Sequence, residues 1–101
     1  MIGLNSIEID KINKVFSKFH SIHSVTVYGS RAKGTHTISS DIDLSLKGED
    51  INLETLNKLS VALDDLLLPY QFDLTIFDNI QNKELLDHIL RVGHLLYEKS
   101  N

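Results

Sequence analysis

Three segments of the chain carry apolar residues at the three- and four-residue spacing of a helix face. We therefore predict helices over residues 6–20, 52–68 and 82–93. An asparagine that can accept a hydrogen bond from a free backbone amide stands at or before each start: Asn5, Asn52 and Asn82. Pro69 ends the second helix, because the residue before a proline is disfavoured in helical geometry. Gly93 is placed to end the third.

Apolar and polar residues alternate between these helices, which predicts strands. The expected strands are residues 24–28, 41–47 and 71–77, with a short fourth strand at 94–98. The order helix–strand–strand–helix–strand–helix–strand indicates an α/β (α+β) fold, in which helices pack on a small mixed sheet of three or four strands. A chain of 101 residues is long enough for one core, so we expect residues 1–101 to form a single domain.

Composition narrows the function classes. Ten basic residues against fourteen acidic ones give a net charge of −4, which argues against direct binding of nucleic acid. The absence of cysteine excludes disulfides and thiolate metal sites and indicates a reducing cytoplasm. An uninterrupted apolar run such as residues 66–68 is far shorter than the ~20 residues of a membrane span, and the N-terminus lacks the features of a signal peptide. We expect a cytoplasmic protein that binds no membrane.

Aspartates stand at unusual places in two of the predicted strands. Asp41 and Asp43 lie two residues apart, so both side chains share the face opposite the apolar one. A solvated face is the alternative, and for this pair alone both interpretations stay open. Asp73 repeats the pattern in the next strand, although aspartate is disfavoured in strands, and this favours a functional site. Three carboxylates repel one another unless a cation neutralises them, and hard oxygen ligands suit Mg²⁺ or Mn²⁺.

The segment between the first two strands, residues 29–40, is rich in glycine, serine and threonine and predicts a turn with one helical turn inside it. Gly29 and Ser30 open that turn, where free amides and a glycine allow close approach of an anion. Arg31 and Lys33 add positive charge. An ordinary strand-to-helix turn is the alternative for the glycine and serine alone. Their position ten residues before the aspartate pair favours a cleft for a metal-bridged nucleoside triphosphate.

The spacing of Gly29-Ser30, ten residues and Asp41-Ile42-Asp43 resembles the signature of the DNA polymerase beta-like nucleotidyltransferase superfamily. Residues 29–34 and 40–44 are similar to the minimal nucleotidyltransferase family, small bacterial and archaeal proteins of which many are antitoxins of HEPN-domain toxins. Asp73 and the ending at residues 93–98 are also of that type, so the resemblance covers nearly the whole chain. It implies the nucleotidyltransferase fold.

The resemblance also implies roles for single residues. Gly29 and Ser30 would hold the triphosphate tail of ATP, and Arg31 would be a further phosphate contact. The carboxylates of Asp41 and Asp43 would bridge two Mg²⁺ ions, with Mn²⁺ as a possible substitute.

Asp73 would bind the catalytic metal and help to deprotonate the attacking hydroxyl. That hydroxyl would then attack the α-phosphorus in line, and pyrophosphate would leave.

The acceptor is expected to lie on a second protein. Few residues follow Asp73, so the cleft should be open on one side and too shallow to bury a small acceptor. By resemblance the partner is a helical HEPN-type protein and the modified group a tyrosine hydroxyl. The alternatives are a non-catalytic antitoxin that neutralises its partner by binding it, and a bare Mg²⁺-binding or nucleotide-sensing domain. Formation of a homo-oligomer is left open.

The histidines are kept out of this site, with one exception. Four are interpreted as surface or helix-end residues: His20, His23, His88 and His94. His36 lies in the loop that faces the proposed cleft, so its role stays open, as does that of Lys33.

Overall fold

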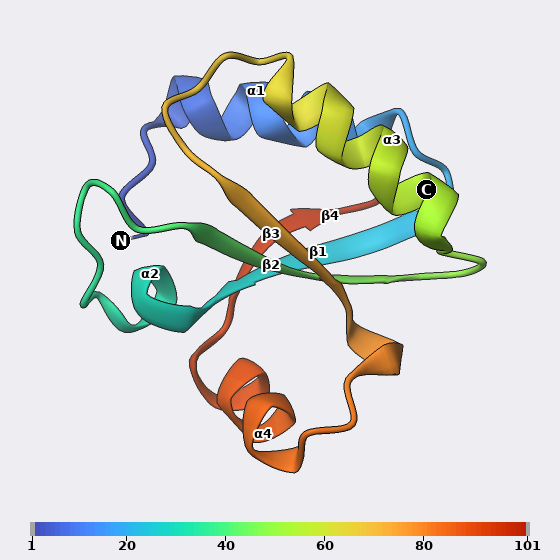
Figure 1. Cartoon of the computed structure of the whole chain (residues 1–101). Coiled ribbons are helices and arrows are strands. Elements are labelled where there is room, and N and C mark those ends of the chain that lie inside the picture. Colours follow the sequence, from blue (N-terminus) through green and yellow to red (C-terminus); the bar gives the residue numbers. More distant parts are fainter. Residues whose placement is uncertain (1, 101) are drawn as a thin grey trace.

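The computed structural model describes residues 2–100, which form a four-stranded sheet with helices on both faces (Figure 1). In chain order the elements are α1 (Ser6–Ser17), β1 (Ile22–Tyr28), α2 (Gly29–Lys33), β2 (Ile42–Gly48), α3 (Leu53–Asp64), β3 (Phe72–Ile76), the 3₁₀ helix η1 (Phe77–Asn79), α4 (Lys83–Val92) and β4 (His94–Glu98). The predicted order of helices and strands is confirmed, and the fourth strand has the predicted bounds. The helical turn expected within residues 29–40 is α2.

All three predicted asparagine caps are present. The Asn5 side chain accepts a hydrogen bond from the backbone of Glu8 at 2.8 Å, and the Glu8 carboxylate accepts one from the Asn5 amide at 3.0 Å. Two of the helices end earlier than predicted, α1 three residues and α3 four residues before the expected end. At the end of α3 the chain turns back towards β3 through Leu67, whose φ of +57° is left-handed and incompatible with a continuing helix.

The strands lie in the order β3-β2-β1-β4. Strand β1 runs antiparallel to both of its neighbours, whereas β2 and β3 are parallel. A parallel pair needs a crossover connection, which α3 provides between β2 and β3. The sheet is therefore mixed, as predicted, and β3 and β4 are its edge strands.

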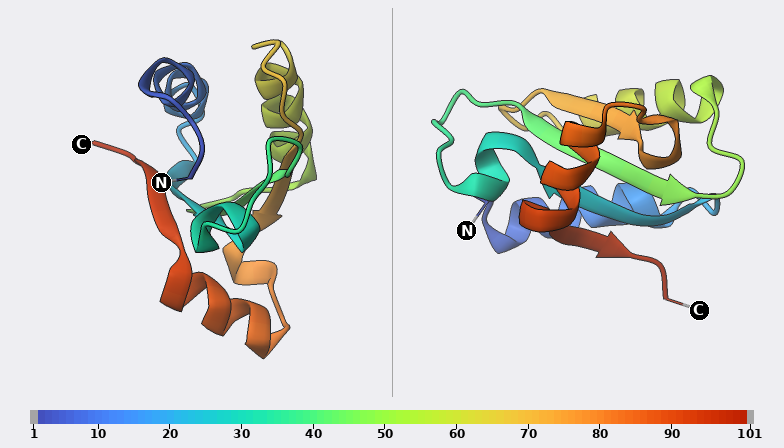
Figure 2. Two further views of the ribbon diagram at one scale, coloured as in Figure 1. Left: turned by 90° about the vertical axis from the view of Figure 1, so that its left-hand side faces the viewer. Right: turned by 90° about the horizontal axis from the view of Figure 1, so that it is seen from below.

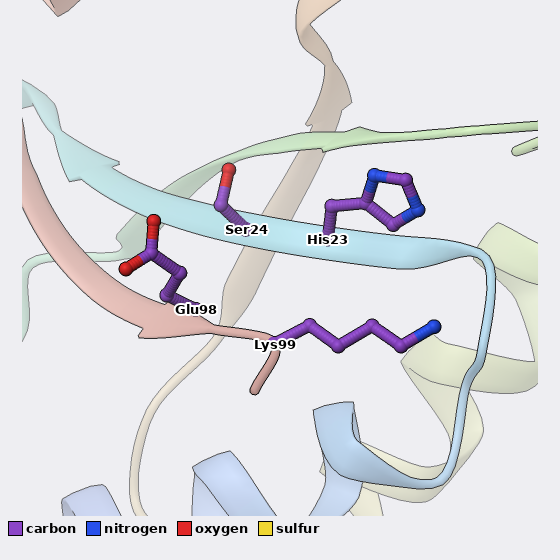
Figure 3. Close-up of a pocket in the computed structure, with 4 residues that line it drawn as sticks. All are labelled: His23, Ser24, Glu98 and Lys99. Atoms are coloured by element: carbon purple, nitrogen blue, oxygen red, sulfur yellow. The ribbon is translucent and has the colours of Figure 1, made fainter. Parts of the chain in front are cut away.

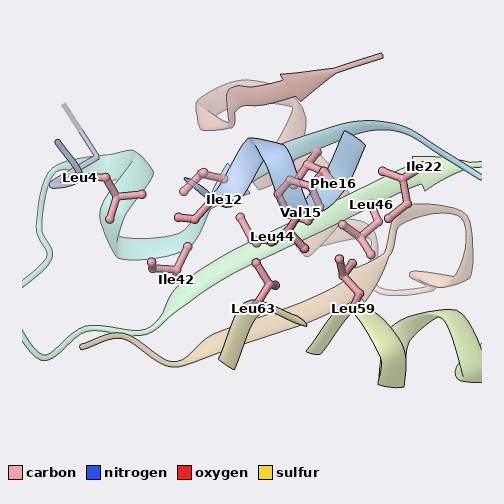
Figure 4. Close-up of a cluster of buried hydrophobic side chains, with 12 residues drawn as sticks. Leu4, Ile12, Val15, Phe16, Ile22, Ile42, Leu44, Leu46, Leu59 and Leu63 are labelled. Atoms are coloured by element: carbon pink, nitrogen blue, oxygen red, sulfur yellow. The ribbon is translucent and has the colours of Figure 1, made fainter. Parts of the chain in front are cut away.

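The two faces of the sheet are covered differently. Helices α1 and α3 lie side by side on one face, and α4 lies on the other, where it packs against β1 and α2 (Figure 2). The apolar core fills the space between α1, α3 and the sheet (Figure 4). Its buried members are Leu4, Ile12, Val15, Phe16, Ile22, Val25, Val27, Ile42, Leu44, Leu46, Leu59 and Leu63. Within residues 2–100, none of the helices combines the length and apolar character that a membrane crossing requires.

Candidate functional site

The face of the sheet turned away from the core carries a row of polar side chains. The register of the parallel pair places Asp43 of β2 directly beside Asp73 of β3. On the other side, the register of β1 places Tyr28 beside Asp43. The Tyr28 hydroxyl lies 3.3 Å from the Thr75 hydroxyl, two residues along β3 from Asp73. The sequence-based prediction that Asp43 and Asp73 lie opposite the apolar face is confirmed, and the structure adds that their strands are neighbours.

The charges in this row act on one another. Burial raises the pKa of the Asp43 carboxyl above its ordinary value, and the charges of Asp73 and Asp41 raise it further, against a smaller opposing effect of His88. Burial also raises the pKa of Tyr28, and the two carboxylates Asp43 and Asp73 add to this rise, so the phenol stays protonated. The ionised carboxylates therefore destabilise one another in the absence of a cation.

Asp41 is positioned differently from Asp43 and Asp73. Asp41 precedes the first residue of β2 and is exposed, whereas Asp43 lies within the ladder. In the part of the chain that the structure describes, no three His, Cys, Asp or Glu side chains are gathered as metal ligands. The expected convergence of all three carboxylates on one point is thus not seen. The donor set still fits Mg²⁺ or Mn²⁺, because Asp43 and Asp73 present hard oxygens side by side and a divalent cation would relieve their repulsion.

Gly29 forms the junction between β1 and α2 and lies against the aspartate row. Its φ of +74° is left-handed, a conformation that side chains other than glycine rarely adopt. A Cβ atom at this position would collide with the Asp43 carboxylate. Glycine is therefore required at this position for two reasons: the left-handed backbone conformation and the lack of space for a Cβ beside the Asp43 carboxylate. The predicted proximity of the Gly29-Ser30 turn to the aspartates is confirmed.

His88 is a residue of this site that the sequence interpretation missed. The Gly29 backbone N–H donates a hydrogen bond to His88 Nε2 at 2.9 Å. The ring also stands edge-on to the Tyr28 ring, with centroids 6.2 Å apart. The available signal was helical phase, since His88 follows Leu85 by three residues and shares its inward-facing side of α4.

The prediction of Arg31 as a phosphate contact is wrong. Its side chain is only 2% exposed and points into the protein. The guanidinium donates to the Ser40 carbonyl from Nε at 3.3 Å and from Nη2 at 3.0 Å, and to the Ile2 carbonyl from Nη1 at 3.0 Å. It also lies over the Tyr70 ring, 5.0 Å from the centroid. Three of its five N–H donors are thus engaged by backbone carbonyls inside the fold.

Two other features lie outside the aspartate row. His36 is half-buried against the N-terminal segment, where a Cβ on Gly3 would collide with its ring. A polar pocket occurs at the opposite end of β1 from Gly29 and includes none of the predicted site residues (Figure 3). Its lining consists of His23, Ser24, Glu98 and Lys99. The candidate site is therefore the open row beside Gly29 rather than an enclosed cavity.

Comparison with known families assigns the chain to one of them. Residues 10–101 match the family model described as polymerase beta, nucleotidyltransferase. The chain belongs to the polymerase beta nucleotidyltransferase family. The family assignment covers every predicted site residue, from Gly29 to Asp73. Among curated proteins, none is significantly similar in sequence to this chain.

Solved structures share the nucleotidyltransferase fold. A toxin–antitoxin complex with AMP-PNP superposes with a TM-score of 0.73 at 21% identity, over 91% of this chain and 74% of that chain. An MntA–HpeT toxin–antitoxin mutant, in which two aspartates are replaced by glutamate, gives 0.74 at 20% identity, over 96% and 76%. The tri-AMPylated HEPN toxin of Shewanella oneidensis in complex with an MNT antitoxin gives 0.69 at 17% identity, over 95% and 74%. At these identities the likeness shows the fold, as the sequence predicts.

Proposed function

We propose that the protein is a Mg²⁺-dependent nucleotidyltransferase that transfers AMP from ATP to a hydroxyl of a partner protein and acts as an antitoxin of a helical HEPN-type toxin. The observation that carries this proposal is the row of Asp43 and Asp73 beside Gly29, in a chain of the nucleotidyltransferase family. The cytoplasmic location expected from the cysteine-free sequence stays a prediction.

In this proposal the residues of the site have separate roles in nucleotidyl transfer. The Gly29 amide is already bonded to His88, so the donors that remain for the triphosphate tail begin at Ser30, whose side chain is half-buried at the start of α2. Asp41, Asp43 and Asp73 would hold the Mg²⁺ ions, which when bound neutralise charge on the attacking and leaving oxygens.

Asp73 would receive the proton of the attacking hydroxyl, and its exposed position on the edge strand β3 supports this role. A bond then forms between that hydroxyl oxygen and the α-phosphorus, and the bond to pyrophosphate breaks.

The placement of Asp73 also supports a protein acceptor. Strand β3 is an edge of the sheet, so a partner can approach the carboxylate from outside. Proximity supplied by such an interface contributes much of the rate of a transfer between two molecules. The solved complexes of the same fold contain AMP-PNP in one case and an AMPylated HEPN toxin in another, which supports ATP as the donor and a protein as the acceptor. A tyrosine hydroxyl as the acceptor group follows from the family resemblance alone.

A binding module is the second candidate, and one observation favours it. The three carboxylates are not arranged as a metal site within residues 2–100, as a chain that acts by complex formation alone would allow. Such a protein would neutralise its partner without modifying it.

The deciding experiment is mass spectrometry of the HEPN-type partner after incubation of the purified complex with ATP and Mg²⁺. We expect a mass increase of one or more AMP groups, and we expect Asp73→Asn to abolish it. The matched control is Asp78→Asn, the same change at an exposed aspartate of η1 that is outside the site. A stable complex with an unmodified partner would overturn the transferase proposal in favour of the binding module.

A further inference from the structure

Arg31 is the one charged side chain that is fully buried within residues 2–100. Burial of a charge is costly, and the cost is usually offset by a carboxylate partner. Neither of the two ion pairs formed by the described residues includes Arg31. Its positive charge is instead distributed over two backbone carbonyls and the face of Tyr70. The arrangement calls for an explanation beyond packing.

The contacts of Arg31 join the two halves of the nucleotidyltransferase motif. The residue directly follows Gly29-Ser30, and its guanidinium holds the carbonyl of Ser40, which directly precedes Asp41. The side chain therefore bridges the ten-residue interval between the turn and the aspartate pair from one end to the other. Its contact with Tyr70 lies two residues before the start of β3, the strand that carries Asp73.

Asp41 depends on this bridge more than the other aspartates do. Asp43 and Asp73 are fixed by the register of β2 and β3. Asp41 stands outside the ladder, whose nearest bond runs from the Ile42 amide to the Gln71 carbonyl at 2.8 Å. On its N-terminal side, the adjoining carbonyl of Ser40 is held by two guanidinium N–H groups.

We infer that Arg31 is a positioning residue that fixes Asp41 relative to the Gly29-Ser30 turn, without touching the nucleotide itself. This inference rests on the proposed nucleotide site. A planar guanidinium can direct two donors at one carbonyl and a third at another, whereas a lysine ammonium has no such fork. Arg31→Lys is therefore the informative variant, because it retains the charge and loses the paired hydrogen bonds to Ser40.

The first test is a double-mutant cycle on binding of ATP with Mg²⁺, measured by calorimetry. We expect Arg31→Lys to weaken binding about tenfold, roughly the value of one hydrogen bond. In an Asp41→Asn background the same change should have no further effect, because the group it positions is already lost. In a Ser30→Ala background it should retain its full effect. An equal loss in both backgrounds would overturn the inference and leave Arg31 a general structural residue.

The second test needs no nucleotide. Amide hydrogen exchange of the unliganded Arg31→Lys protein should be faster in residues 34–42 and unchanged at Val27 and Leu44, which lie in the core ladder. Faster exchange at Val27 and Leu44 as well would mean global destabilisation and would refute the positioning role. Arg91→Lys is the control, since Arg91 is an exposed residue of α4 paired with Asp87.

The two tests separate the inference from the proposed function. If the wild-type protein binds no ATP with Mg²⁺, the proposed function fails. The exchange measurement then decides whether Arg31 fixes the segment that carries Asp41. Equal exchange rates of residues 34–42 in the wild type and in Arg31→Lys would overturn that role.

Discussion

The two faces of strand β2 contribute in opposite ways to the stability of the fold. On β2, the residues turned towards α1 and α3 are Ile42, Leu44 and Leu46, all fully buried. The residues between them, Asp43 and Ser45, face the side covered in part by α4. Burial of apolar surface on the first face stabilises the fold by about 25 cal/mol per Å².

The second face costs stability. The pKa of Asp43 is raised by burial and by like charges, and the buried Ser45 hydroxyl has no hydrogen-bond partner among the described residues. Sites kept for chemistry commonly carry such costs, and the opposite face of the same sheet offsets them.

The largest test of this comparison uses adjacent residues of β2. Leu44→Ala should lower the free energy of unfolding by about 2–5 kcal/mol, because it opens a cavity in the core. Asp43→Asn in Mg²⁺-free buffer should leave stability unchanged or raise it, since it removes one of the repelling charges. Urea denaturation measures both. A comparable loss in Asp43→Asn would mean that Asp43 is structural and that the two faces do not differ as described.

A pair of glycines sharpens the comparison within the site. Gly29 and Gly34 both have left-handed φ, +74° and +79°, but a Cβ on Gly34 meets nothing within 4 Å. Alanine at either position should cost about 1–2 kcal/mol through backbone strain. Only Gly29→Ala should also lose binding of ATP with Mg²⁺, because its Cβ displaces the Asp43 carboxylate. Calorimetric titration of both variants checks this, and equal affinities would show that the Gly29–Asp43 contact has no bearing on the nucleotide.

The smallest expected effect is a dependence of stability on pH. The pKa of Asp43 is raised in the folded protein, so the folded state takes up its proton at higher pH than the unfolded state does. The contribution of Asp43 is therefore least favourable near pH 7. It improves as the pH falls through the raised pKa, until the unfolded state is also protonated near its ordinary value of 3.8.

Without Mg²⁺, Asp43→Asn should thus exceed the wild type in stability most at pH 7 and progressively less at lower pH. Thermal melts of the two proteins across this range measure the difference. A difference that grows on acidification would reverse the sign and exclude repulsion as its cause.

Local patterns predicted much of this structure. Each asparagine cap acts on an amide two or three residues away, and the strand alternation that places Asp43 and Asp73 on one face is equally local. The bond from the Gly29 amide to His88 spans 59 residues, and that from Arg31 to Ile2 spans 29. Both depend on how α2 sits against other elements. For that reason the sequence placed the Gly29-Ser30 turn correctly and the Arg31 side chain wrongly.

The sheet order also bears on how the chain acquires its structure during synthesis. Strand β1 pairs on one edge with β2, which follows it closely in the sequence. Its other edge pairs with β4 near the end of the described chain, where Glu98 lies opposite Ser24. Contacts between such distant segments form late, because the intervening chain must first be ordered. Before α4 and β4 have been synthesised, the nascent chain has an unpaired β1 edge and no acceptor for the Gly29 amide. The Gly29-Ser30 turn therefore gains its last hydrogen bond after most of the core has formed.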